Sequence, residues 1–483
     1  MNPLSQVKKQ YARFQNNRVG RSLEKRKGAS PFVLAPQAPN VLKEKRGFMN
    51  KEELKQKLLE AVKARRADIE AIAESILREP ELGYKEVKTS AKVKAIFDEL
   101  GVEYTTGWGL TGVKARLKGG KPGKTVAILG ELDAVICKNS PYAAESGAAH
   151  CCGHNIQIAN MLAVAWALKD SGVMKDFAGD VVFFAVPAEE YVELGYRAGL
   201  VKEGKISYLG GKEQIIKEGG FDDIDIALQM HVAVTEKPNG FYGSGASCNG
   251  FIGKIVEYNG KAAHAAGCPD KGINALNAAM LGMMGVNAIR DRFREDEYVR
   301  FHPILTNAGD LVNVVPDHVT MESYVRAASI DGMKRYNDDI NRALRAGADA
   351  IGAECVIHDM PGYLPLRPNL QLRGILEENA RAFFPAEDIA AGPHNTASTD
   401  MGDVSHLIPI VHAWVGCVRG ALHGANYKLA DKDTAFEKSP AILAWTLVDL
   451  LAGAGEGAEE ICKNFKPLLT KKTYCEFMDS IGK

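Results

Sequence analysis

A short apolar run lies at Thr125-Val126-Ala127-Ile128-Leu129-Gly130, and its composition predicts a strand buried on both faces. Two similar runs follow, at Asp180-Val181-Val182-Phe183-Phe184-Ala185-Val186 and at Asp225-Ile226-Ala227-Leu228-Gln229-Met230. Helical periodicity separates the runs, for example from Ile156 to Leu168. Strands that alternate with helices indicate an α/β domain built in layers around a largely parallel sheet.

The pattern differs on both sides of these runs. Apolar residues at three- and four-residue spacing predict helices from Lys51 to about Leu77 and from Ser90 to Leu100. From about Gly245 to Cys355, two alternating, strand-like segments each precede a helical segment. This unit predicts a small α+β domain inserted into the larger one.

We therefore expect four parts: a basic, disordered extension at 1–48, the first part of a catalytic domain at 49–245, an inserted domain at 246–358 and the rest of the catalytic domain at 359–483. Residues 1–48 hold eleven Lys and Arg against Glu24 and Glu44, a local charge of +9, so the remaining chain carries about −9. That balance argues against a nucleic-acid surface. A transit peptide and a true start at Met49 are alternative interpretations of the extension.

Composition also bears on the cellular compartment of the protein. A chain of 483 residues is long enough for two domains or more. It has no run of 18 apolar residues, which predicts no membrane span, and no apolar core of a secretory signal. Nine cysteines without regular spacing favour free or metal-bound thiols in a reducing cytoplasm over a disulfide framework.

Three groups could carry chemistry. Cys152 and His154 flank one glycine, so a tight turn can bring both to one metal ion, although a buried Cys beside a surface His has the same pattern. Glu189-Glu190 follows a predicted strand, where one carboxylate can hold a metal while the other moves a proton. His231 follows another strand and is, alone, equally typical of a core histidine.

These groups belong to a longer series of motifs over about residues 49–451. The series is Pro80-Glu81-Leu82-Gly83-Tyr84-Lys85-Glu86, Gly130-Glu131-Leu132-Asp133-Ala134, His150-Cys151-Cys152-Gly153-His154-Asn155, Pro187-Ala188-Glu189-Glu190, Met230-His231-Val232, Gly260-Lys261-Ala262-Ala263-His264-Ala265, Asn313-Val314-Val315-Pro316-Asp317, Ser398-Thr399-Asp400-Met401-Gly402-Asp403-Val404-Ser405 and Leu422-His423-Gly424. Their order resembles the metal-dependent aminoacylase and carboxypeptidase family of amidohydrolases, and within it the aminobenzoyl-glutamate hydrolase branch.

The resemblance implies a three-layer, mixed-sheet metallopeptidase-like catalytic domain with an inserted lid that also forms a homodimer. It implies one or two divalent ions, zinc or manganese, with cobalt also possible. The implied ligands are Cys152, His154, Glu190, His231 and His423. A small-molecule amide is the implied substrate, with no nucleic-acid or membrane partner.

The same resemblance implies the catalytic roles. Glu189 would be the general base, and Asp133 would orient a metal-bound imidazole or the catalytic glutamate. His264, supplied by the lid of a partner subunit, would stabilise the oxyanion, and Asn313 would contact the substrate.

Several positions depart from the family pattern. Cys151 stands where a small residue is usual, and we expect it in the core. The stretch 191–217 is long and is expected to line the substrate entrance. His406 and His412 are alternatives to His423, and we expect both to be structural or supporting residues.

The favoured reaction is hydrolysis of an N-acyl or N-aroyl amino acid by metal-activated water. A dipeptidase or an N-acyl-amino-acid deacylase would use the same site. A hydrolase with Cys152 as nucleophile and His154 as base would not need the remaining ligands. A non-catalytic binding protein would be expected to lose some of them.

Overall fold

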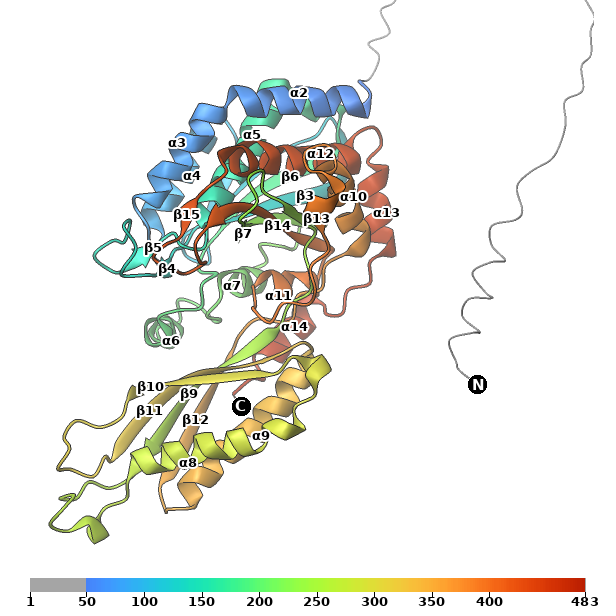
Figure 1. The fold of residues 1–483 in the computed structure, drawn as a ribbon. Helices are drawn as coiled ribbons and strands as arrows, with labels where there is room; N and C mark the ends of the chain where they lie inside the picture. Colours follow the sequence, from blue (N-terminus) through green and yellow to red (C-terminus); the bar gives the residue numbers. More distant parts are fainter. Residues whose placement is uncertain (1–48, 483) are drawn as a thin grey trace, which may run out of the picture. The chain divides into compact units, whose positions relative to one another are not determined.

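Nine strands form the main sheet of the computed structural model, which describes residues 49–482 (Figure 1). Their order is β1 (Tyr104–Trp108), β2 (Gly112–Leu117), β6 (Ala178–Val186), β3 (Lys121–Glu131), β7 (Ile226–Val234), β14 (Ile410–Arg419), β8 (Tyr242–Gly243) and β13 (Ile389–Ala390), with β15 (Lys428–Leu429) paired to β14. β6, β3, β7 and β14 are mutually parallel, whereas β1, β2 and β8 pair antiparallel. The sheet is therefore mixed, as predicted. The extension at 1–48 lies outside the described residues.

The central strands are buried on both faces. In β3, Val126 and Ile128 face one apolar core, while Ala127 and Leu129 face another. Successive side chains of a strand point to opposite faces, so helices must cover the sheet on both sides. The three-layer arrangement follows directly from the apolar runs in the sequence.

The helices divide between the two faces of the sheet (Figure 1). One face is covered by α2 (Lys51–Ala64), α3 (Arg66–Leu77), α4 (Val87–Leu100), α5 (His154–Ser171), α10 (Leu370–Ala380), α12 (Ser439–Leu451) and α13 (Glu456–Asn464). The other is covered by α7 (Gly211–Glu218), α11 (Met401–Ser405) and α14 (Lys471–Met478). α5 carries His154 at its first position and is buried along nearly its whole length, so it forms a rigid support for that residue.

The helical pattern expected from Lys51 to Leu77 is two helices. Asn50 caps α2: its side-chain oxygen accepts the Glu53 N–H at 2.9 Å, and Glu53 accepts the Asn50 N–H at 3.0 Å. The chain leaves helical geometry at Arg65, and α3 begins at the next residue. The apolar spacing continues across this break, which is why the sequence pattern does not show it.

A second, antiparallel sheet has the order β10 (Arg300–Asn307), β11 (His318–Ala327), β9 (Gly250–Asn259) and β12 (Glu354–Pro361). α8 (Ala275–Ala288) and α9 (Ile330–Asp349) pack on it around a separate apolar core. The sequence predicted the two inner strands and both helices. It missed the edge strands, β10 and β12, because nearly all their residues are exposed or half-buried and give little apolar signal. β12 runs across residue 358, where we placed a domain boundary.

No helix within residues 49–482 is long and apolar enough to cross a membrane.

Candidate metal centre

The site lies where the carboxyl ends of four parallel strands meet. Because β6, β3, β7 and β14 run the same way, the segments that follow them reach one edge of the sheet. Asp133 follows β3, and Glu189 and Glu190 follow β6. His423 lies beyond β14. His231 differs slightly from expectation, because β7 continues to Val234 and so His231 lies within the strand.

Two groups of possible metal ligands share one sulfur atom. Cys152, His154 and His231 form the first group, and Cys152, Glu190 and His423 form the second, each with ligand atoms within 4.8 Å of one another. The Cys152 Sγ lies 3.4 Å from His231 Nε2 and 3.3 Å from His423 Nε2. His423 Nε2 is in turn 3.0 Å from Glu190 Oε1. The Cys152 thiol therefore belongs to both candidate ligand sets, which adjoin at this sulfur atom.

The backbone conformations of Gly153 and His423 bring these candidate ligands together. Gly153, between Cys152 and His154, has φ +90°, and a Cβ there would lie 2.3 Å from Val232 Cγ2. Only glycine suits both the conformation and the space, so it lets the chain turn from the cysteine directly into α5. His423 also has a positive φ, of +60°, and its N–H donates to the Cys151 carbonyl at 2.9 Å. That bond connects the last candidate ligand, His423, to the cysteine segment.

Hydrogen bonds orient the imidazoles. His154 Nδ1 donates to the Asp133 carbonyl at 2.8 Å, and His231 Nδ1 donates to the Val232 carbonyl at 2.7 Å. Both rings therefore turn Nε2 toward the site, in the tautomer that a metal ion requires. The Asp133 carboxylate accepts the Glu190 N–H at 2.9 Å, so Asp133 positions a histidine and a glutamate together.

The chemistry of this donor set fits divalent cations. Glu190 Oε1 and His154 Nε2 are buried, and within the described residues each has a charged contact at 3.0 Å, with His423 Nε2 and with Glu131 Oε2 respectively, but no hydrogen bond of good geometry. Burial raises the pKa of Glu189, and repulsion from Glu131 and then Glu190 raises it further. Positive ions placed among these groups would offset this repulsion. A thiol, imidazoles and carboxylates suit zinc or manganese.

Glu189 belongs to neither group that shares the thiol, but with Glu131 and His154 it forms a third group that could hold a metal ion. Its Oε2 is 3.9 Å from His154 Nε2, and its side chain is 12% exposed, on the wall of the site cavity. The preceding Ala188 has φ +55°, and its N–H donates to Glu86 Oε1 at 2.8 Å. The buried Glu86 thus holds the turn that presents Glu189.

A buried ionic network supports the site and was not predicted. The Lys212 ammonium bonds Glu131 and Asp400, and all three side chains are buried. Gln157 and Gln229 also donate to the Glu131 carboxylate. Glu131 Oε2 is 3.0 Å from His154 Nε2, so the network reaches a candidate ligand. Glu131 and Asp400 stood within quoted motifs, but nothing in the sequence pattern links them to Lys212.

The site opens into a cavity of about 820 Å³. Its walls are largely apolar and include Phe241 and Trp414, and its polar lining includes His394, Asn395, Ser398 and Thr399. His412 also lines it, with no hydrogen-bond partner on either ring nitrogen among the described residues. His406 instead bonds the Pro365 carbonyl at 2.9 Å, away from this cavity.

Two expected site residues lie apart from the cavity. His264 and Asn313 are exposed neighbours in loops of the second-sheet region, where the Ala265 N–H donates to the Asn313 carbonyl at 2.9 Å. Neither lines the cavity of its own chain.

The stretch 191–217 does not line this cavity, contrary to our expectation. It forms α6 (Leu194–Lys202) and part of α7, and its apolar side chains pack with Phe251 and Tyr363 in a separate core. This stretch contains Lys212 and Arg197, which are both buried behind the site, and it does not form the entrance for substrate.

The fold and this site define a metal-dependent hydrolase. The sequence profile of peptidase family M20/M25/M40 matches residues 127–447, and the chain belongs to this family. The Xaa-Arg dipeptidase of Mus musculus is 28% identical over 71% of this chain and 73% of its own length. The N-acetylcysteine deacetylase of Bacillus subtilis is 27% identical over 70% of this chain and 85% of its own.

Solved structures share the fold. A dinuclear metal-binding peptidase of the M20 family from Bacillus subtilis has a TM-score of 0.61 at 21% identity, over 80% of this chain and 98% of that one. An aminobenzoyl-glutamate utilization protein from Klebsiella pneumoniae has a TM-score of 0.58 at 19% identity, over 83% and 98%. The chain is therefore an amidohydrolase or peptidase of this family, with the family's fold and metal dependence.

Proposed function

We propose that this enzyme hydrolyses the amide bond of an N-acyl or N-aroyl amino acid, of the aminobenzoyl-glutamate type. One observation carries the proposal: two ligand groups share the Cys152 thiol, and the Glu189 carboxylate lies on the same cavity wall. A thiol that is needed as a ligand in both groups is poorly placed to act as the nucleophile. The arrangement therefore favours attack by water over attack by cysteine.

The candidate ligands, Glu189 and Asp133 have separate roles in the proposed reaction. Cys152, His154 and His231 would hold one ion, and Cys152, Glu190 and His423 a second. Bound divalent ions supply a Lewis acid and lower the pKa of water. Glu189 takes a proton from the attacking water and returns it to the leaving amine. Asp133 holds His154 and Glu190 in place while this happens.

His264 and Asn313 would come from a second copy of the chain. In one chain both are exposed and outside the cavity, so a homodimer in which the lid of one subunit reaches the other site would complete it. His264 would then donate a hydrogen bond to the oxyanion, and Asn313 would contact the substrate carbonyl or carboxylate. Closure of the lid would also exclude water.

The cavity supports a substrate with an aromatic acyl group and a carboxylate. Phe241 and Trp414 provide an aromatic wall for the acyl part. Ser398 lines the same cavity and accepts a hydrogen bond of 2.6 Å from Arg326, whose guanidinium stacks on Phe251 and Tyr324. A carboxylate on the amino-acid side would find this cation nearby.

A dipeptidase is the second candidate. It is favoured by the Xaa-Arg dipeptidases of mouse and human, whose similarity extends over about 70% of this chain. The same ligands and the same Glu189 would serve, so the difference between the candidates concerns only what fills the cavity.

A substrate screen with defined metals tests both candidates. Full-length enzyme loaded with Zn²⁺ or Mn²⁺ is assayed on N-aroyl-glutamates, N-acyl amino acids and dipeptides. We expect the highest kcat/KM on an N-aroyl or N-acyl amino acid, and a higher value on dipeptides would replace the first candidate by the second. Chelator should abolish turnover, and activity that survives chelator but not iodoacetamide would overturn metal-dependent hydrolysis.

A further inference from the structure

Residues 188–191, which we call the base segment, carry Glu189 and Glu190 between β6 and α6. Ala188 has φ +55°, a conformation that a residue with a side chain seldom adopts. Such a conformation persists only where the surrounding structure imposes it. Contacts around the base segment therefore decide where the Glu189 carboxylate lies.

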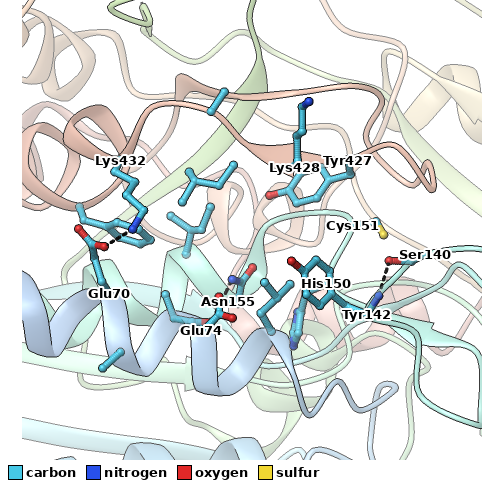
Figure 2. A pocket seen from close by; sticks show the side chains of 17 residues that line it. Glu70, Glu74, Ser140, Tyr142, His150, Cys151, Asn155, Tyr427, Lys428 and Lys432 are labelled. Atoms are coloured by element: carbon cyan, nitrogen blue, oxygen red, sulfur yellow. Dashed lines mark hydrogen bonds and ion pairs between the residues drawn. The ribbon is translucent and has the colours of Figure 1, made fainter.

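A second cavity, of about 750 Å³ and lined by Cys151, is separate from the one that holds the metal centre (Figure 2). It is formed by α3, by the start of α5 and by the segment 427–436, and Figure 2 shows Cys151 beside Ser140 on its wall. The base segment, which the structure describes in full, does not line this cavity. The contacts that hold Glu189 come instead from the inserted domain and the chain that leaves it.

Three hydrogen bonds join the base segment to the inserted domain. The Tyr363 hydroxyl donates to the Glu189 carbonyl. The Tyr191 hydroxyl donates to the Pro361 carbonyl at 2.5 Å, and the Tyr324 hydroxyl donates to the Tyr191 carbonyl at 2.6 Å. Tyr324 lies in β11 and Pro361 ends β12, so these partners belong to the second sheet, and Tyr363 follows directly after it.

Close ring packing reinforces these bonds. The Tyr191 ring meets the rings of Phe251, Tyr324 and Tyr363 nearly edge-on, at centroid distances of 4.9, 5.9 and 5.5 Å. A Cβ at Gly253 in β9 would lie 3.2 Å from Tyr191 Cε1, so the tyrosine lies directly against that strand. Closely packed interiors transmit displacements instead of absorbing them. A movement of the second sheet is thus passed to Tyr191.

Tyr363 also lies on one of the two connections between the domains. The chain enters the inserted domain at β9 and leaves it at β12, and these two strands are paired with each other. The pairing continues outside the sheet, where the Phe251 N–H donates to the Tyr363 carbonyl at 2.8 Å and the Leu366 N–H donates to the Cys248 carbonyl at 3.0 Å. Any rotation of the inserted domain bends the chain at these connections and so shifts Tyr363.

We propose that Tyr324 and Tyr363 are positioning residues for Glu189, and that through them the orientation of the inserted domain sets where the Glu189 carboxylate lies. The positioning itself stands on the contacts above. Its effect on turnover rests on the proposed role of Glu189 as general base. A base works only within hydrogen-bond reach of its proton, so a displaced Glu189 lowers kcat while substrate binding is retained.

Two conservative variants test the proposal. Tyr363→Phe and Tyr324→Phe each remove one hydroxyl that donates to the base segment and keep the packed ring. Tyr258→Phe is the matched control, because Tyr258 is buried in the same domain and donates to the Leu344 carbonyl at 3.3 Å, within that domain. All measurements use the full-length, metal-loaded enzyme.

Hydrogen exchange of residues 187–192, followed by mass spectrometry, reports the positioning without any assay of activity. We expect exchange there to be about fivefold faster in Tyr363→Phe and in Tyr324→Phe, with exchange in α5 unchanged, and we expect no change in Tyr258→Phe. Unchanged exchange in either test variant would overturn the role of that tyrosine. Equal acceleration in Tyr258→Phe, or acceleration in α5 as well, would show general loosening and would overturn the proposal.

Turnover on the preferred substrate of the screen tests the consequence for Glu189. We expect Tyr363→Phe to lower kcat about tenfold while KM and metal content stay within about twofold of wild type. In a Glu189→Gln background the same substitution should change the residual kcat by less than about twofold, because it acts through Glu189. Equal factors in both backgrounds, or a rise in KM with unchanged kcat, would overturn the link to the base.

The two experiments fail separately. Full turnover in Glu189→Gln would overturn the proposed general base, and the exchange data would still decide whether the tyrosines hold the base segment. Faster exchange with unchanged kcat in Tyr363→Phe, while Glu189→Gln is inactive, would overturn the proposed dependence of turnover on the inserted domain and leave the general base intact.

Discussion

The Cys152 thiol and the His423 imidazole lie 3.3 Å apart although 271 positions of sequence separate them. The contact joins a segment that precedes α5 to one that follows β14, and it closes the second ligand group. Cys152 belongs to both groups, so it is the residue whose loss should affect the metal centre most.

We predict that Cys152→Ala loses both metal ions. Removing a partner that only orients a ligand typically weakens metal binding about 10–100-fold, and removing a shared ligand should exceed that. Metal content after dialysis, measured by mass spectrometry, checks this. Cys151→Ala is the matched control, because its thiol lies in the other cavity, and it should retain its metal. Equal metal loss in both variants would contradict the bridging role.

We predict that Glu189→Gln keeps its metal but loses turnover by about 10²–10⁴-fold, the usual contribution of a general base. Glu193→Gln is the control: it lies on the same segment, pairs with Lys85 at 2.8 Å and does not line the cavity. Its kcat should remain within a few-fold of wild type. Measurements of kcat and metal content test the role of Glu189 as general base. Retained turnover in Glu189→Gln would exclude Glu189 from that role.

We predict that Lys212→Met lowers the free energy of unfolding by about 3–5 kcal/mol, because it leaves the buried carboxylates of Glu131 and Asp400 without their cation. Lys217→Met, on the same helix with its side chain 35% exposed, should cost no more than about 0.5 kcal/mol. Urea unfolding of both metal-free variants compares them. Adding Asp400→Asn to Lys212→Met should recover part of the loss, and additive losses would show that the pair is uncoupled.

We predict that stability of the metal-free enzyme falls between about pH 4.5 and pH 7 in part because of Glu86. Burial, and then repulsion from Asp133, raises the pKa of Glu86 from 4.5 to about 7. In that window the unfolded chain releases the proton while the folded chain keeps it, so rising pH favours unfolding by up to about 3 kcal/mol. Urea unfolding at pH 5 and pH 8 should show a smaller decline in Glu86→Gln. Parallel declines would exclude this titration.

We predict that mixing two inactive variants restores activity if His264 of one subunit completes the site of the other. A heterodimer of Glu189→Gln and His264→Ala contains one complete site, so random mixing should recover about a quarter of wild-type activity. The mixture is assayed after subunit exchange, and its mass is checked by light scattering. A fully active monomer, or no recovery in mixed dimers, would exclude His264 of the partner subunit from the site.

Much of the fold was readable from local pattern. The apolar run at 125–130 and its two counterparts are central strands, and their double-sided burial enforces the three layers. The edge strands β10 and β12 and the break at Arg65 were missed, because partial burial and an uninterrupted apolar spacing leave no local signal.

The sequence by itself determined the types of candidate ligand and their order, because Cys152, Gly153 and His154 must lie together and Glu189 must follow a strand. Only the tertiary structure decided that Cys152 belongs to two candidate ligand groups, that Lys212 pairs with both Glu131 and Asp400, and that Cys151 lines a separate cavity. These are contacts between segments far apart in the chain. They arise when parallel strands bring their carboxyl ends to one edge, and no local periodicity encodes which distant side chains meet there.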